Sequence, residues 1–271
     1  MLVDSHCHLH LLEYQHPYNN LEDVLNDCHD NHIEHLLCVA IDLQQFPEIL
    51  RLAENHPNIS ISAGVHPNTD EIIPGDFDIS IDVFHNNLLK QANNQKVIAI
   101  GETGLDYYRT VDEKEKNDQI LRLEIHTNVA REVKKPLIIH TRNAQSDTIK
   151  YLNKFQANDV GGVMHCFTED WEMAKLALDL GFYISISGIV SFKNAAQVQD
   201  VASKVPLDRL LIETDCPYLA PVPFRGKPNY PQYVKHVAEK IADLRNIDIG
   251  LVAEQTTANF YNLFGRKNGK I

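Results

Sequence analysis

The sequence predicts an α/β fold, a (β/α)8 barrel of the TIM type. Eight short runs rich in apolar and β-branched residues recur along the 271 residues, and a longer segment with helical spacing of apolar residues follows each run. The runs are almost continuously apolar, as expected for parallel strands that are covered on both faces. The length of the chain is close to the ~250 residues usual for this barrel.

The first run argues against the competing α/β fold, a doubly wound open sheet. That fold normally has a glycine-rich dinucleotide-binding turn after its first strand, whereas the first run here ends in Asp4-Ser5-His6-Cys7-His8. The eight expected strands, in chain order, are Leu2–His8, His35–Ile41, Ile59–Val65, Val97–Gly101, Leu137–Thr141, Gly162–Phe167, Phe182–Gly188 and Arg209–Thr214.

Helical segments are expected between these strands. Apolar residues recur every three or four positions most clearly over 118–134 and 233–244. A last helical segment, 247–264, is expected to pack outside the barrel and close its edge. We therefore expect residues 1–271 to form one domain, with a frayed end at 266–271.

Charge and cysteine content exclude several classes of protein. The net charge of 25 − 37 = −12 disfavours a protein that coats nucleic acid or anionic lipid by bulk charge, although a local basic patch remains possible. No apolar run approaches the ~18 residues of a membrane helix, and the first residues lack the pattern of a secretory signal. The five cysteines form no C-x-x-C pair, which is typical of a reducing compartment. We expect a cytoplasmic protein with no membrane association and no obligate protein partner.

Metal-binding side chains gather at the carboxyl ends of the expected strands, where this barrel builds its active face. His6 and His8 end the first strand, His66 ends the third, Glu102 follows the fourth, His140 ends the fifth, His165 lies late in the sixth and Asp215 follows the eighth. A lone histidine at a strand end is more often an ordinary core or surface residue than a ligand. Random placement does not explain seven such side chains at one end of six strands.

The remaining nine of the 14 histidines are interpreted as ordinary core or surface residues. They are His10, His16, His29, His32, His35, His56, His85, His126 and His236, and we expect most of them to be solvated. None of them is assigned a role in a site.

The alternation of side chains along a strand distinguishes the proposed metal ligands from the neighbouring cysteines. His6 and His8 are two residues apart, so both point to the same side and can share one cation. Cys7 then points the other way, and Cys166 and Cys216, which adjoin proposed ligands, are expected to point outward too. We interpret these three cysteines as small buried apolar residues.

Four imidazoles and two carboxylates exceed the three protein ligands usual at one catalytic zinc. They suit two cations about 3.5–4 Å apart, with Glu102 as the bridge. The first ion would take His6, His8, Glu102 and Asp215, and the second would take Glu102, His140 and His165. We expect the ions to activate a water molecule and Asp215 to accept its proton, so that Asp215 and Glu102 are catalytic. Mixed nitrogen and oxygen ligands favour zinc or manganese over magnesium, but the identity of the metal stays open.

Six ordered motifs resemble those of the TatD family of metal-dependent hydrolases. They are Asp4–Leu9, Gly64–Pro67, Gly101–Tyr108, Lys135–Arg142, Met164–Phe167 and Glu213–Pro221, followed by Arg225-Gly226-Lys227. The resemblance covers nearly the whole chain. It implies a TIM barrel of the amidohydrolase superfamily with a divalent-metal centre on the same ligand set, and metal-dependent hydrolysis of DNA, often as a 3′→5′ exonuclease on single strands.

One motif departs from the family pattern. Many members have Asn-Glu-Pro where this chain has Asn229-Tyr230-Pro231. No role of that glutamate can be transferred to Tyr230. The chain resembles the YcfH-like subgroup, in which this position varies.

Substrate contacts are assigned to residues beside the motifs. Arg142 and Arg225, in expected loops on the metal face, are assigned to phosphate contacts. His66 and Asp106 are expected to orient substrate or to support the metal ligands. Tyr107, Tyr108, Phe167 and Tyr218 are candidates for stacking on a base or for packing at the rim of the barrel.

These observations leave three hypotheses. The first is a binuclear deoxyribonuclease that trims the ends of short or single-stranded DNA. The second keeps the metals but hydrolyses a small amide, an ester or an aminoacyl-tRNA ester, which the acidic composition mildly favours. The third is a non-catalytic barrel whose histidines hold a structural zinc.

Overall fold

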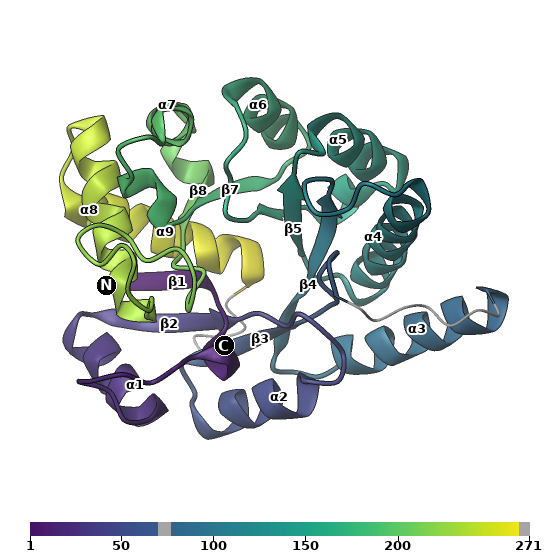
Figure 1. Ribbon diagram of the computed structural model, residues 1–271, viewed down its shortest axis with the longest axis horizontal. Helices are drawn as coiled ribbons and strands as arrows, with labels where there is room; N and C mark the ends of the chain where they lie inside the picture. The colour runs from purple at the N-terminus through teal and green to yellow at the C-terminus, as the bar shows by residue number, and fades with distance from the viewer. Residues whose placement is uncertain (70–76, 266–271) are drawn as a thin grey trace.

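Eight parallel strands form a nearly closed barrel in the computed structural model, which describes residues 1–69 and 77–265 (Figure 1). The strands neighbour one another in sequence order: β1 Leu2–Cys7, β2 Ile33–Cys38, β3 Ile59–Ala63, β4 Val97–Asp106, β5 Leu137–Arg142, β6 Gly162–Met164, β7 Tyr183–Ile186 and β8 Leu210–Ile212. The predicted fold class and the positions of all eight strands are confirmed. The expected frayed end, 266–271, lies outside the described residues.

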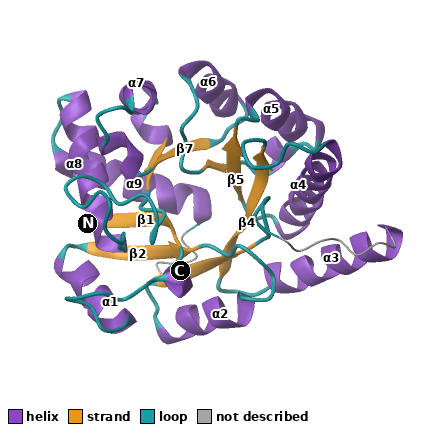
Figure 2. Ribbon diagram, viewed as in Figure 1, coloured by secondary structure: helices purple, strands orange, loops and turns teal. Residues whose placement is uncertain are grey.

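Helices surround the strands (Figure 2). They are α1 Leu21–Asp30, α2 Phe46–Asn55, α3 Phe77–Ala92, α4 Glu113–Val133, α5 Gln145–Lys154, α6 Trp171–Asp179, α7 Ala196–Lys204, α8 Val234–Arg245 and α9 Ile249–Phe264. Helix α4 begins five residues before the expected segment because Asp112 caps it, accepting the backbone N–H groups of Lys114 and Glu115. No described helix is long and apolar enough to cross a membrane.

Alternation along the strands divides the core in two. One set of strand residues, including Leu36, Ile100 and Ile139, packs in the larger cluster that the helices share. The opposite set, including Val3, Ile138 and Leu211, forms a second cluster inside the barrel. The sequence therefore encodes a packed barrel, closed to solvent at its centre.

Helix α9 packs against β1 and β8 and closes the barrel, as expected. Its Phe260 and Phe264 also reach into the interior cluster with Val3, Ile138 and Leu211. The physical reason is that the amino-terminal end of the barrel would otherwise expose apolar side chains, and two phenyl rings cover them.

The barrel closes between β8 and β1 by contacts around the site and not by a strand ladder in the described residues. The backbone N–H of Asp215 donates to the carbonyl oxygen of His6 (2.9 Å), and that of His8 donates to Cys216 (2.8 Å). The buried Asp4 carboxylate accepts the N–H (2.9 Å) and hydroxyl (2.5 Å) of Thr214. These bonds hold the loop after β8 beside the two histidines of β1.

Candidate metal centre

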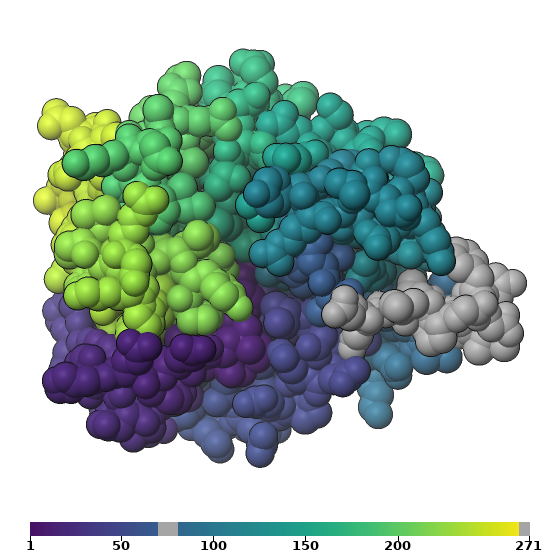
Figure 3. Space-filling view, in the orientation of Figure 1, coloured from purple at the N-terminus to yellow at the C-terminus, as the bar shows by residue number. Residues whose placement is uncertain are grey.

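The six proposed metal ligands meet at one end of the barrel. His6 lies in β1 and His8 directly follows it, Glu102 lies in β4, His140 lies in β5, His165 directly follows β6 and Asp215 follows β8. In the space-filling view, the purple N-terminal part, the blue-green middle and the yellow-green segment after β8 meet on one face of the molecule (Figure 3). Residues from five strands thus converge as the strand-end pattern predicts.

Glu102 lies inside β4 and not after it, which corrects its expected position. Pairing with β5 continues from Thr103, opposite Ile139, to Asp106, opposite Arg142, so β4 is longer than expected. An irregularity in the register between Ile100 and Thr103 sets Glu102 at the point where the ladder shifts. Its backbone N–H donates to the carbonyl oxygen of Ala40 (3.1 Å).

The two oxygens of Glu102 face two different groups of histidines. Oε2 lies 3.4 Å from Nε2 of His6. Oε1 lies 2.9 Å from Nδ1 of His140 and 2.8 Å from Nε2 of His165. The carboxylate is buried between the two groups, which is the arrangement that a bridging ligand requires.

The first group has the spacing of a metal site. Nε2 of His6 lies 3.3 Å from Nε2 of His8, and Oδ1 of Asp215 lies 3.7 and 3.4 Å from these two atoms. Ligands placed tetrahedrally about 2.1 Å from a zinc ion are about 3.4 Å apart. The donor atoms present therefore fit a divalent cation of this size.

The outer nitrogens support the same assignment. His8 Nδ1 lies 3.0 Å from the carbonyl oxygen of Val39, and His165 Nδ1 lies 3.2 Å from Oε1 of Glu213. Each ring donates its Nδ1–H to that acceptor, which leaves Nε2 facing the centre of the site. Metal-binding histidines commonly have this second hydrogen bond.

His66 has the opposite pattern. Its Nδ1 accepts the backbone N–H of Asn68 (3.1 Å), so its Nε2 carries the proton and lies 3.4 Å from Oε1 of Glu102. Burial lowers the pKa of His66 to about 4, so the ring is neutral. The geometry therefore makes His66 a hydrogen-bond donor to the site, although His66, Glu102 and His140 lie close enough to hold a cation.

Asp106 connects β4 to the residues above the site. Its Oδ1 accepts the backbone N–H groups of Tyr108 and Arg109, each at 3.1 Å, and its Oδ2 accepts the side-chain amide of Asn68 (2.6 Å). Oδ2 also lies 3.4 Å from Nε2 of His140. Burial opposes ionisation, but these hydrogen bonds hold the pKa of Asp106 below its usual range.

Opposite charges dominate the electrostatics of the buried centre. Burial opposes charge on Glu102, but the surrounding histidines hold its pKa well below the usual value. Burial likewise disfavours the His165 imidazolium, but Glu102 and Glu213 raise its pKa well above the usual value. The site is therefore a cluster of carboxylates that attracts positive charge, whether protons or a metal.

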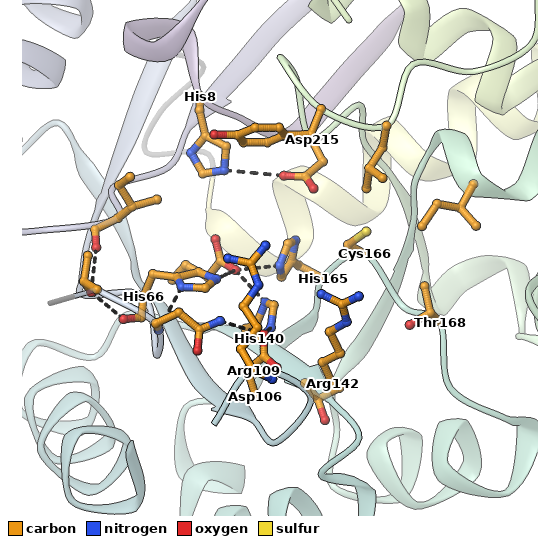
Figure 4. Close-up of a pocket in the computed structure, with 18 of the residues that line it drawn as sticks. His8, His66, Asp106, Arg109, His140, Arg142, His165, Cys166, Thr168 and Asp215 are labelled. Atoms are coloured by element: carbon orange, nitrogen blue, oxygen red, sulfur yellow. Dashed lines mark hydrogen bonds and ion pairs between the residues drawn. The ribbon is translucent and has the colours of Figure 1, made fainter. Parts of the chain in front are cut away.

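A cavity of about 630 Å³ opens above this centre. His8, His66, Glu102, His140, His165 and Asp215 line it, together with Asp106, Arg109 and Arg142 (Figure 4). Arg225 is outside this lining, and its guanidinium lies 4.3 Å from the ring centre of Phe192. Of the two proposed phosphate-binding arginines, the structure brings Arg142 to the cavity.

The three cysteines beside the ligands behave differently from one another. Cys7 and Cys216 are fully buried, as expected, and Cys7 Sγ donates to the carbonyl oxygen of Leu37 (3.3 Å). The expectation for Cys166 is wrong, because this residue lines the cavity. Its backbone φ of 42° turns the chain directly after β6, and strand alternation no longer applies there.

Two of the nine histidines interpreted as ordinary core or surface residues are buried. His126 on α4 accepts the backbone N–H of Val65 at Nε2 (2.9 Å), and its Nδ1 donates to the carbonyl oxygen of Arg122 (2.6 Å). His35 is buried in β2 and bonds to Ser60 (3.0 Å). Both are core residues held by hydrogen bonds, and neither reaches the site.

Tyr230, which replaces the common glutamate, braces a loop outside the cavity. It is buried, its hydroxyl donates to the carbonyl oxygen of Glu13 (3.0 Å), and its ring packs against Tyr18. The neighbouring Asn229 donates to the carbonyl oxygens of Thr214 and Tyr218 in the loop after β8. The departure from the family pattern thus falls on a structural position.

Two residues of the centre, Glu213 and Arg109, were given no role from the sequence. Glu213 stands two positions before Asp215, and an acid at the buried end of a strand was the available signal. Its Oε1 accepts the backbone N–H of Cys166 (2.7 Å) as well as His165. Arg109 is expected from the sequence in a loop on the metal face, and the structure places it in the lining of the cavity.

Comparison with known proteins places this geometry in a family. The sequence profile described as TatD related DNase matches residues 3–265. The chain belongs to the TatD-related DNase family. An uncharacterized metal-dependent hydrolase of Escherichia coli K12, YcfH, is 44% identical over 263 residues, which cover 97% of this chain and 95% of that protein. YabD of Bacillus subtilis, with the same description, is 38% identical over 97% of this chain and 99% of its own length.

Solved structures agree with the TatD assignment. The crystal structure of YJJV, a TatD homologue from Escherichia coli K12, superposes with a TM-score of 0.85 at 27% identity, covering 97% of each chain. A TatD family hydrolase from Entamoeba histolytica has a TM-score of 0.80 at 21% identity, also over 97% of each chain, and this more distant likeness shows the fold alone.

Proposed function

We propose that this TatD-family protein is a divalent-metal-dependent phosphodiesterase that hydrolyses DNA, trimming short or single strands from the 3′ end. The observation that carries the proposal is the position of Glu102, whose Oε2 lies beside His6 and whose Oε1 lies beside His140 and His165. A pair of cations that shares one carboxylate is common in enzymes that hydrolyse phosphate esters. The DNase description of the family supports the choice of DNA.

The chain's own residues suit this chemistry. His6, His8, Glu102 and Asp215 would hold one cation, and Glu102, His140 and His165 the other. When bound, zinc, manganese or magnesium supplies Lewis acidity and lowers the pKa of water. Although burial opposes it, the neighbouring His8 and His6 hold the pKa of Asp215 below its usual value. Asp215 is therefore ionised at neutral pH and able to accept a proton from the attacking water.

The lining of the cavity favours an anionic substrate over a neutral amide. Arg142 brings a guanidinium group to the cavity, where it lies 3.9 Å from the ring centre of Tyr108. Guanidinium groups bind phosphate with paired hydrogen bonds. Arg225, outside the lining, would contact a strand that extends beyond the cavity. The net charge of −12 then limits broad binding of nucleic acid but not the local grip of one phosphodiester.

Turnover of short single-stranded DNA tests the proposal. The purified protein is expected to release nucleotides from the 3′ end with Mg²⁺, Mn²⁺ or Zn²⁺, and to lose this activity in EDTA. His140→Ala is expected to lose it as well, whereas His29→Ala, at a side chain that is 91% exposed, retains it. Full metal loading without cleavage of DNA would contradict the proposed substrate.

A second panel distinguishes the bond that is broken. Bis-nitrophenyl phosphate is compared with acyl esters, amides and aminoacyl-tRNA under the same metals. Preference for the phosphodiester supports the proposal, and preference for an acyl bond would replace it with the small-substrate alternative.

We also propose that the protein acts in the cytoplasm, since all five cysteines are free thiols.

A further inference from the structure

Two arginine side chains line the cavity. Arg109 follows β4 and Arg142 ends β5, and both side chains point into the cavity from the side opposite His8 and Asp215 (Figure 4). Within residues 1–69 and 77–265, no carboxylate forms an ion pair with either of them. Arg131, by contrast, lies 2.8 Å from Asp159. In an acidic protein, two arginines without a carboxylate partner in a cavity indicate an anionic ligand.

The scaffold below these arginines is fixed. The buried Asp106 accepts the backbone N–H groups of Tyr108 and Arg109, which sets the loop after β4. The ring of Tyr108 then lies 3.9 Å from the guanidinium carbon of Arg142. A guanidinium that rests on an aromatic ring keeps its edge N–H groups free for a phosphate. Tyr108 therefore holds the guanidinium of Arg142 in place, and Asp106 fixes the backbone from which Arg109 projects.

Arg142 is separated from the metal centre by one step along β5. His140 and Arg142 are two residues apart on the strand, opposite Gly104 and Asp106 of β4, and both line the cavity. Two residues of a strand span about 6.6 Å. This step is comparable with the distance between neighbouring phosphates of a nucleotide strand. Because the two residues leave β5 at different points, Arg142 is available to a second anionic group beside the one at Glu102 and His140.

We propose that Arg109 and Arg142 form a second anion subsite, which binds the phosphate next to the scissile one. The inference rests on the proposed phosphodiesterase function and narrows its substrate class to nucleotides that carry at least two phosphate groups. A minimal small ester would fill the metal centre and leave this subsite unused.

Binding of nucleotides without a phosphodiester bond tests the subsite separately from catalysis. Thymidine 3′,5′-bisphosphate is titrated into the manganese-loaded protein by calorimetry, and thymidine 5′-monophosphate and 3′-monophosphate are titrated separately. The bisphosphate is expected to bind about tenfold more tightly than either monophosphate, as one charge-assisted contact would provide. The advantage is expected to shrink as salt is raised.

Substitutions test whether the tighter binding of the bisphosphate depends on the two arginines. Arg142→Ala and Arg109→Ala are each expected to reduce the ratio of affinities to about twofold or less, and Arg142→Lys to reduce it partially, because lysine keeps the charge but loses the paired donors. Arg51→Ala, at an exposed position on α2, is the matched control and keeps the full ratio. The thermal midpoint of each variant is measured to verify folding.

The outcomes separate this inference from the proposed function. Equal affinity for bisphosphate and monophosphates in the wild type, or a full ratio in a folded Arg142→Ala or Arg142→Lys protein, overturns the subsite. A normal ratio in a protein that cleaves no phosphodiester supports the subsite and overturns the proposed activity. Cleavage of DNA by a protein that binds the bisphosphate no more tightly than the monophosphates supports the proposed activity and overturns the subsite.

Discussion

Glu213 contacts the ring nitrogen of His165 that faces away from the metal centre. Oε1 of this buried carboxylate lies 3.2 Å from Nδ1 of the ring, and Nε2 of the same ring lies 2.8 Å from Oε1 of Glu102. The same oxygen of Glu213 accepts the backbone N–H of Cys166 (2.7 Å). Because Glu213 touches the ring and its neighbouring backbone, it fixes both the rotation and the tautomer of His165. Glu213 is a positioning residue, since it acts on the centre through His165.

Glu213→Gln is therefore expected to weaken metal binding without removing a ligand. The amide presents either its oxygen or its NH₂ group to Nδ1, and losing such a carboxylate typically costs 10–100-fold in metal affinity. Competition with a chromophoric chelator measures this affinity directly. Glu239→Gln, at a partly exposed glutamate 2.7 Å from His236, is the control. Unchanged affinity in Glu213→Gln would contradict the positioning role.

Metal affinity is expected to rise with pH. Burial opposes a proton on His165 and His140, but Glu102, together with Glu213 for His165 and Asp106 for His140, outweighs burial and raises both pKa values. The metal-free centre thus holds protons at neutral pH that a cation must displace. Calorimetry in buffers with different ionisation enthalpies measures the protons released, and about one or more per cation is expected above pH 6. An affinity that does not change between pH 5 and pH 8 would contradict this electrostatic description.

His126 is expected to make the fold sensitive to acid. Burial lowers its pKa to about 4, whereas the unfolded chain has a value of 6.5, so between these values the unfolded state binds more protons. The free energy of unfolding therefore falls as the pH decreases from 6.5 to 4, by about 2 kcal/mol at pH 5 for this residue. Urea unfolding at pH 7 and pH 5 measures the loss. His126→Gln is expected to show a smaller difference between the two pH values than the wild type, and the exposed His29→Gln the same difference as the wild type.

Both the barrel and the meeting of the proposed ligands at one end of it could be predicted from the sequence, because both follow from the positions of the strands. Strand ends carry the active face of this fold, so His6, Glu102 and Asp215 could be assigned to it without knowledge of their distances. The alternation rule also separated His6 and His8 from Cys7. Such periodic rules hold wherever the backbone is regular.

The predictions failed where the backbone leaves the regular strand or where a contact joins distant segments. Cys166 lines the cavity because its φ of 42° breaks the alternation. The role of Glu213 depends on its contact with His165, which no spacing in the sequence reveals. His126 is buried because α4 brings it to Val65, 61 residues earlier in the chain.

Phe260 separates the stability of the barrel from the metal centre. Its ring is fully buried in α9 and packs with Val3, Ile138 and Leu211 inside the barrel, at the end opposite the ligands. Phe260→Ala would leave a cavity there, and the free energy of unfolding is expected to fall by about 3–5 kcal/mol. Leu251→Ala, at an exposed position on the same helix, should lower the free energy of unfolding far less.

Metal content per folded protein should stay the same in both variants, because the strand ends that carry the ligands are held by their own hydrogen bonds between β1 and the loop after β8. Loss of metal from folded Phe260→Ala protein would show that the two ends of the barrel are coupled, and that the closure by α9 also sets the geometry of the centre.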